Sequence, residues 1–350
     1  MNLFDALEWS QWKKLSNEVK SQVISQVLMY FVSPLKKVSN VEYKQFQIAG
    51  IKCTSFECLI DNEPFVLVPG NKETILGWDL GTQGLPVTVW DQKTKSEDKK
   101  FLEIKRNYQL ETTKDWDIFV NESTSPLRKV SIPPMLIQKK ATPVGTEFIG
   151  VLDAITGIFK GDNEKYAKVQ EELNACFQQV NSLEESLIKP VPRELYKKNL
   201  FYAWLDTNTE KYHVYSHQEC TQKSLKEKLD AEVFDLLSED QWEYAVAAGT
   251  RKLFRWGNDI DRNQPYYGKQ VIKKIEQSNM FGLYFDFSFS HWEITNSNRL
   301  KLEKQAEVGI PLYDCLPLSS YYRSQKILSE NEYLDADSFL YRKAIIIQNE

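Results

Sequence analysis

The sequence contains few of the side chains that usually carry metal, redox or disulfide chemistry. Only 5 cysteines and 3 histidines occur among its 350 residues. An odd and sparse set of cysteines argues against a disulfide framework, because a chain of this length can bury an adequate apolar core without such links. Since structural disulfides belong to oxidising compartments, we expect a cytoplasmic protein.

Long apolar runs and an excess of positive charge are also missing. No segment approaches the roughly 20 consecutive apolar residues that cross a bilayer, so we expect no membrane association. The apolar stretch 27–32 follows charged positions that do not fit a signal peptide. The formal net charge is -5, and no basic stripe suited to phosphate binding occurs, so nucleic acid is not an expected partner.

Three segments show the apolar periodicity of helices. The first spans residues 12–31 and ends before Pro34. The second spans residues 162–187, where apolar residues recur every three and four positions over three heptads. This second apolar face can be covered either by the protein's own core or by a partner helix, and self-association through 162–187 stays open. The third begins with the capping box of residues 238–241, Ser-Glu-Asp-Gln, and ends at Gly249.

A strand-rich stretch follows the first helix. Residues 46–68 are rich in β-branched and aromatic side chains and are interrupted at Gly50 and at residues 61–62, Asp-Asn. Short turn-forming pairs between apolar runs are typical of hairpins, so we expect a hairpin at residues 61–62. Residues 90–124 are polar and weakly periodic, and we expect an irregular excursion there.

The residues most suited to metal binding are His213, His217 and Cys220. Their spacing fits one face of a helix, and three such ligands could grip zinc if a fourth were near. The surrounding sequence, however, alternates as a strand does, which directs the two histidines to one face and Cys220 away from it. We therefore predict no metal site. The sequence also contains no phosphate-binding loop and no nucleophile elbow.

Several sequence blocks resemble, in order and content, those of the formylglycine-generating enzyme, or sulfatase-modifying-factor, family. The blocks are FVLVPG at 65–70, ILG at 75–77, LLSEDQWEYA at 236–245, FRWGN at 254–258, NMFGLY at 279–284 and WE at 292–293. The resemblance implies an α+β, formylglycine-generating-enzyme-like (C-type-lectin-like) domain, loop-rich, with twisted antiparallel strands and a few helices. It covers residues 46–350, with insertions at about 86–125 and 160–195, and leaves residues 1–45 as an N-terminal amphipathic helical segment.

The departures from the family pattern bear on catalysis. Active members carry a late pair of cysteines that bind copper, whereas this region offers only Cys315. Copper(I) prefers soft thiolates, and one thiol does not make a two-coordinate site. The family's calcium-coordinating loop is rewritten at residues 288–291. We therefore expect that copper and calcium are lost, that no cofactor is bound and that formylglycine-generating activity is absent.

The resemblance then implies a catalytically degenerate family member acting as a binding or interaction module. Its partner is an unidentified protein or small molecule, and its candidate ligand-binding residues are Trp256, Asn258, Asn279 and Arg323. A first alternative is a divergent enzyme of the formylglycine-generating or nonheme-metal oxidoreductase superfamily, using Cys315 as nucleophile or redox thiol near Arg323. A second alternative is a structural subunit assembled through the amphipathic helices.

Overall fold

A computed structural model describes residues 2–48, 50–87, 90, 99–178, 192–206, 209–258, 260, 277–286, 290–304 and 308–348. Internal contacts divide the chain into two compact units. The larger unit comprises Met1–Ala141, Lys228–Leu328 and Tyr341–Glu350, and the smaller unit comprises Thr142–Glu227 and Ser329–Leu340. The boundary predicted at residues 45 and 46 falls inside a strand, and the predicted insertion at about 160–195 covers only part of the smaller unit.

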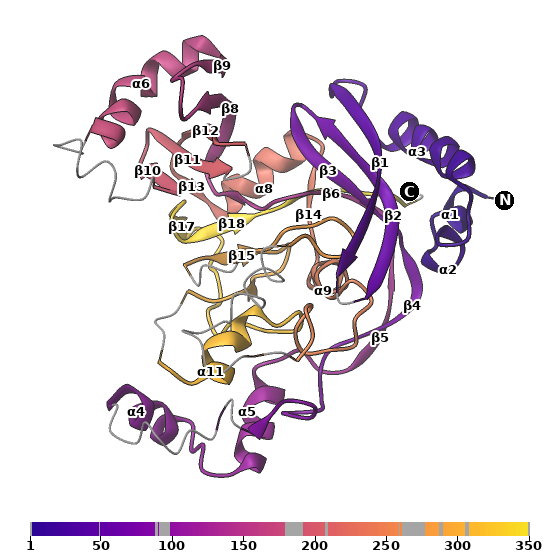
Figure 1. Ribbon diagram of the computed structural model, residues 1–350, viewed down its shortest axis with the longest axis vertical. Helices are drawn as coiled ribbons and strands as arrows, with labels where there is room; N and C mark the ends of the chain where they lie inside the picture. Colours follow the sequence, from indigo (N-terminus) through magenta and orange to yellow (C-terminus); the bar gives the residue numbers. More distant parts are fainter. Residues whose placement is uncertain are drawn as a thin grey trace. The chain divides into compact units, whose positions relative to one another are not determined.

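The larger unit is built on a six-stranded sheet with the order β1–β2–β3–β6–β19–β14. Every neighbouring pair is antiparallel. The strands are β1 Val38–Ile48, β2 Ile51–Ile60, β3 Glu63–Val68, β6 Met135–Gln138, β19 Lys343–Ile346 and β14 Asp235–Leu236. Central strands carry apolar side chains on both faces when both faces are covered, and residues 65–68 of β3 are fully buried. Because β19 pairs with both β6 and β14, distant parts of the sequence meet in one sheet (Figure 1).

The predicted hairpin at residues 61–62 is confirmed. Ile60 pairs with Glu63 across the turn between β2 and β3. Asp61 and Asn62 adopt φ angles of 50° and 69°. Short asparagine and aspartate side chains tolerate this left-handed region, which two-residue hairpins require.

The N-terminal segment forms three helices, α1 Leu3–Ala6, α2 Trp9–Trp12 and α3 Asn17–Phe31. The long helix therefore begins later than the predicted residue 12, because the Ser16 side chain accepts a hydrogen bond from the Val19 amide and caps α3. Trp12 ends α2, and its indole donates to the Thr54 carbonyl of β2 at 2.9 Å. Helix α3 lies beside β1 and β2 (Figure 1), where the Tyr43 hydroxyl contacts Asn17.

The prediction of an irregular excursion at residues 90–124 is wrong for the described part of that range. Residues Lys99–Asn107 form α4 and Thr113–Glu122 form α5. A capping box between Thr112 and Asp115 begins α5, and Trp116 and Val120 bury one face of it. The polar composition hid this short helix because only two of its side chains are buried.

The capping box predicted at residues 238–241 is confirmed at the start of α9, Glu239–Ala247. Ala248 and Gly249 end the helix with φ angles of 47° and 74°. All residues from 242 to 247 are buried, so protein surrounds α9 on every side of its last turns. The unit also contains β4 Asn71–Leu76 paired with β5 Arg128–Ile132, β15 Trp292–Ile294 paired with β16 Leu300–Lys301, α11 Pro311–Cys315 and a 3-10 turn at Leu316–Leu318.

The smaller unit is a five-stranded antiparallel sheet with the order β10–β11–β12–β8–β9 and one covering helix. Its elements are β8 Thr146–Asp153, β9 Phe159–Gly161, α6 Asn163–Gln178, β10 Glu194–Lys197, β11 Phe201–Asp206 and β12 Lys211–His217. The unit also contains the short strands β7 Thr142–Pro143, β13 Cys220–Thr221 and β17 Tyr333–Leu334. Helix α8 Gln222–Ala231 and strand β18 Phe339–Tyr341 begin in the smaller unit and end in the larger one.

The apolar face of α6 is covered by the protein's own sheet (Figure 1). Tyr166, Val169 and Leu173 are buried in one cluster with Phe201 and Tyr212 of the strands. This packing accounts for the first part of the predicted heptad face. The second part, residues 179–187, lies outside the described residues.

The predicted α+β class, with antiparallel sheets and a small number of helices, is confirmed. Within the described ranges, no helix has both the length and the apolar character required to cross a membrane.

Candidate binding site

Asn279 connects the turn at residues 279–283 to the end of α9. Its Nδ2 donates to the Ala245 carbonyl at 2.6 Å, and its Oδ1 accepts from the amides of Phe281 at 3.0 Å and Leu283 at 3.1 Å. The side chain is 0% exposed. Asn279, expected from the sequence to bind ligand, therefore has no surface for direct contact and instead positions the turn that carries Phe281.

Trp256 and Asn258 also use their side chains mainly for contacts within the protein. Trp256 is 2% exposed, and its ring stacks on Phe254 with centroids 4.9 Å apart. The half-buried Asn258 donates from Nδ2 to the Gly84 carbonyl at 2.9 Å. No donor in the described part of the chain reaches its Oδ1. Of these two predicted ligand residues, only Asn258 keeps a polar atom that is not already hydrogen-bonded there.

Arg323 belongs to an ion-pair network on α9. Its Nε and Nη2 donate to the two carboxylate oxygens of Glu239 at 2.7 and 2.8 Å, a bidentate arrangement. Lys301 donates to the same carboxylate at 2.9 Å. Although burial raises the pKa of Glu239, the hydrogen bonds and charges of Arg323 and Lys301 lower it to about 2. Arg323 thus anchors α9 through Glu239.

Glu243 is the centre of the same network. It is 0% exposed and accepts from Lys301 Nζ at 2.7 Å, from Arg128 Nη2 at 2.9 Å and from the Ser125 hydroxyl at 2.9 Å. Arg128 also pairs with Asp240. The three acids of α9 thus form ion pairs with three cations from separate segments. Glu243, the glutamate of the WEYA block, therefore has a structural role.

The candidate catalytic and metal residues are dispersed. Cys315 is 0% exposed at the end of α11. His213 and His217 lie on β12, as the alternation predicted, whereas Cys220 begins β13. The His213 ring stacks on Trp204 with centroids 4.3 Å apart. Among the residues that the structure describes, no group of three or more histidine, cysteine, aspartate or glutamate side chains could hold a metal ion.

A groove of about 310 Å³ lies in the larger unit, along β4. We call it the β4 groove. Five of the six residues of β4 line one side, and residues of α2, α9, the segment after α9, the turn at 279–283 and Tyr321 line the rest. The lining residues are Trp9, Asn71, Glu73, Thr74, Ile75, Leu76, Tyr244, Ala247, Gly249, Thr250, Arg251, Met280, Phe281 and Tyr321.

The aromatic walls of the β4 groove are held by contacts with one another. Phe281 meets Trp9 edge-on with ring centroids 5.9 Å apart and lies 5.5 Å from the ring of Tyr244. The Tyr244 hydroxyl donates to a backbone carbonyl at 3.0 Å, and burial raises its pKa. Burial likewise raises the pKa of Tyr321 to about 12. Both phenols are therefore neutral at physiological pH. Phe281, Tyr244 and Tyr321 are 0%, 3% and 1% exposed, so these rings support the groove from the interior. The half-buried Trp9 is the aromatic lining residue that keeps ring surface for a ligand.

Arg251 is the positively charged residue that lines the β4 groove. Its side chain is exposed, and Nη1 donates to the Ile75 carbonyl at 3.0 Å. No carboxylate in the described ranges forms an ion pair with it. Glu73, the acidic lining residue, already pairs with Lys129 at 3.0 Å. The groove therefore combines an apolar floor with one cation at its rim, a common design of ligand sites.

Sequence reasoning missed most of this groove. Tyr244, Met280 and Phe281 lie inside the quoted blocks, and the aromatic content of those blocks was a usable signal. Trp9 lies in the N-terminal segment and approaches the others only through the fold. Its contribution was hidden because nothing local links it to Phe281.

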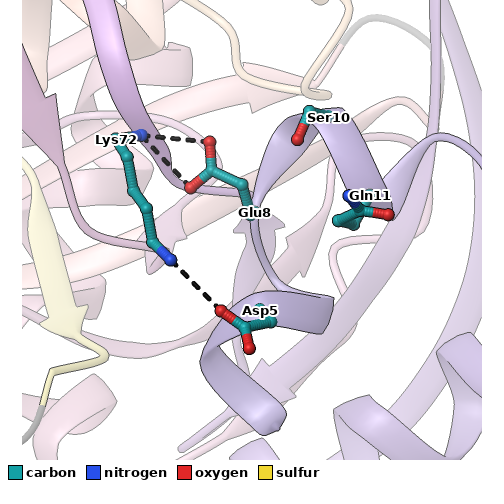
Figure 2. A pocket seen from close by; sticks show the side chains of 5 residues that line it. All are labelled: Asp5, Glu8, Ser10, Gln11 and Lys72. Carbon is teal, nitrogen blue, oxygen red and sulfur yellow. Dashed lines mark hydrogen bonds and ion pairs between the residues drawn. The ribbon is translucent and has the colours of Figure 1, made fainter. Parts of the chain in front are cut away.

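A second hollow, of about 500 Å³, lies beside β4 and is lined by polar and charged residues. Figure 2 shows its lining, namely Asp5, Glu8, Ser10, Gln11 and Lys72. Lys72 donates from Nζ to Asp5 at 3.1 Å and from its amide to both oxygens of Glu8 at 3.0 and 3.1 Å. Its charged groups thus bind one another, which makes it a weaker ligand site than the β4 groove.

Comparison with known families places one match in the smaller unit. Residues 147–216 match a family described as a profilin-like domain of unknown function (DUF7278). The matched range spans β8 to β12 and includes α6. Comparison with curated proteins gives no significant match. The family match therefore names a fold type for the sheet of the smaller unit and no activity.

Proposed function

We propose that this chain is a catalytically inactive protein whose larger unit is a formylglycine-generating-enzyme-like, C-type-lectin-like domain, and that it works as a binding module through the β4 groove. The observation that carries the proposal is the composition of the groove: the half-buried ring of Trp9, held against the buried Phe281, the exposed side chain of Ile75 and a single cation at the rim. Three of the family-like blocks contribute to its lining, through Leu76, Tyr244 and Phe281.

The state of Cys315 argues against the enzymatic alternative. A catalytic or redox thiol must meet its substrate, whereas this side chain is 0% exposed. Arg323, the cation expected beside it, is engaged by Glu239. Binding requires neither residue, since an apolar surface and one charge suffice to recognise a small apolar or peptide ligand.

A neutral fluorescent dye, Nile red, tests whether the β4 groove binds apolar groups. Ile75→Asn removes an apolar wall, and Ile118→Asn on α5 is the matched control because both isoleucines are 47% exposed. Losing about half of an isoleucine contact costs about 1 kcal/mol, so we expect the Kd of the dye to rise about fivefold in Ile75→Asn alone.

Near-UV circular dichroism of each variant shows whether tertiary packing is retained. The proposal fails if the native protein does not bind the dye, or if the two well-folded variants bind it as tightly as the wild-type chain does.

A further inference from the structure

The edge of β4 that faces away from β5 carries, among the described residues, a single parallel bridge at its start. On one side β4 pairs with β5, its partner strand among the described residues. On the other side the chain's own N-terminal segment makes one parallel step: the Trp9 amide donates to the Gly70 carbonyl at 2.8 Å, and the Gly70 amide donates to the Leu7 carbonyl at 3.0 Å. Helix α2 then starts at Trp9 and carries the chain away from the edge.

Side chains meet the edge beyond that step. The Glu8 carboxylate accepts from the Lys72 amide at 3.0 and 3.1 Å, and the Arg251 guanidinium donates to the Ile75 carbonyl at 3.0 Å. A neighbouring strand would supply an acceptor and a donor of the same kind from its backbone. An added strand would therefore use the Lys72 amide and the Ile75 carbonyl, which lie within and beyond the bulge of β4 between Asn71 and Thr74. The β4 groove is lined by the same strand.

We propose that the ligand of the β4 groove is the carboxy-terminal segment of a peptide, added to β4 as a parallel strand with its terminal carboxylate on Arg251. This inference rests on the proposed function of the groove. Side chains of an extended peptide alternate, so every second one points into the β4 groove, toward the half-buried ring of Trp9, while the backbone pairs with β4.

Charge and direction support this occupant over an uncharged one. Arg251 is exposed, and no acid in the described part of the chain pairs with it, while its planar guanidinium matches a carboxylate in a bidentate pair. Arg251 binds the Ile75 carbonyl, near the C-terminal end of β4. A carboxylate held there makes the peptide run parallel to β4, as the Leu7–Trp9 step does.

Two libraries of acetylated random hexapeptides test the inference on the full chain. Both end in valine, leucine or phenylalanine; one has a free carboxylate and the other a carboxamide. Peptides retained by the protein are identified by mass spectrometry, and the Kd of the most enriched peptide is measured. We expect the acid to bind about tenfold more tightly than its amide, and Arg251→Gln to remove that difference. Arg106→Gln, an exposed arginine on α4, is the control and should preserve it.

Backbone N-methylation of the enriched peptide separates strand addition from side-chain binding. Methyl groups at alternate positions should abolish binding, and methyl groups at the positions between them should leave it within about twofold. Equal capture of acid and amide, or equal binding by Arg251→Gln, overturns the inference. If Nile red binds in the groove but no peptide is captured, the inference is overturned and the proposed function stands. If neither Nile red nor any peptide binds, both the inference and the proposed function fail.

Discussion

Replacing Glu243 by glutamine removes the central charge of the network on α9 and keeps the shape of the side chain. The carboxylate is 0% exposed and receives hydrogen bonds from Lys301 at 2.7 Å and from Arg128 at 2.9 Å. Removing one member of a buried ion pair typically costs about 3–5 kcal/mol, because the partner's charge stays buried without compensation. Each cation here keeps a second acid, Glu239 or Asp240, so we expect the lower end, about 3 kcal/mol.

Urea unfolding followed by tryptophan emission measures this loss in the larger unit, because all tryptophans except Trp204 belong to that unit. The double variant Glu243→Gln, Lys301→Met removes both charges of the shorter of the two ion pairs that Glu243 forms. We expect it to be at least about 1 kcal/mol more stable than the sum of the two single losses implies. The reasoning is refuted if Glu243→Gln costs less than about 1 kcal/mol, or if the two single losses add without coupling.

Two further predictions concern residues that hold α9. Because the pKa of Glu239 is about 2 in the folded chain and 4.5 ordinarily, its ion pairs contribute stability above pH 4.5. As pH falls from 4.5 toward 2, we expect a loss of up to about 3 kcal/mol in the free energy of unfolding; Glu239→Gln should flatten this part of the profile, and an unchanged slope would contradict the assignment. Asn279→Ala leaves buried amides and a carbonyl without partners, so thermal unfolding should show a loss of about 2–4 kcal/mol; a loss under about 0.5 kcal/mol would show that the turn does not depend on this side chain.

Local signals in the sequence predicted the elements whose hydrogen bonds close over a few residues. The Asp61–Asn62 pair fixes a hairpin through its own backbone preference, and Ser238 with Gln241 caps α9 within three positions. Helix α5 carried a comparable signal in Thr112 and Asp115, which its polar surroundings concealed.

Features that depend on distant segments were not accessible in this way. Arg128 is far from Lys301 and Arg323 in the sequence, and all three lie outside α9, yet the fold brings these cations together on α9. A motif alone predicts Asn279 as a ligand residue, and only the burial of its side chain reveals a positioning role. The β4 groove likewise required Trp9 to meet Phe281.

The insertion of the smaller unit into the larger one sets an order on biosynthesis. Strand β19 pairs with β6, and the Lys343 amide that donates to the Gln138 side chain is 205 positions further along the chain. While the ribosome is still translating the residues between them, the edge of β6 that will pair with β19 is unpaired. This edge can then form strand pairs with other nascent chains. All strands of the smaller unit's sheet lie within residues 146–217. This sheet can therefore form early, before β19 is synthesised and pairs with β6 in the larger unit.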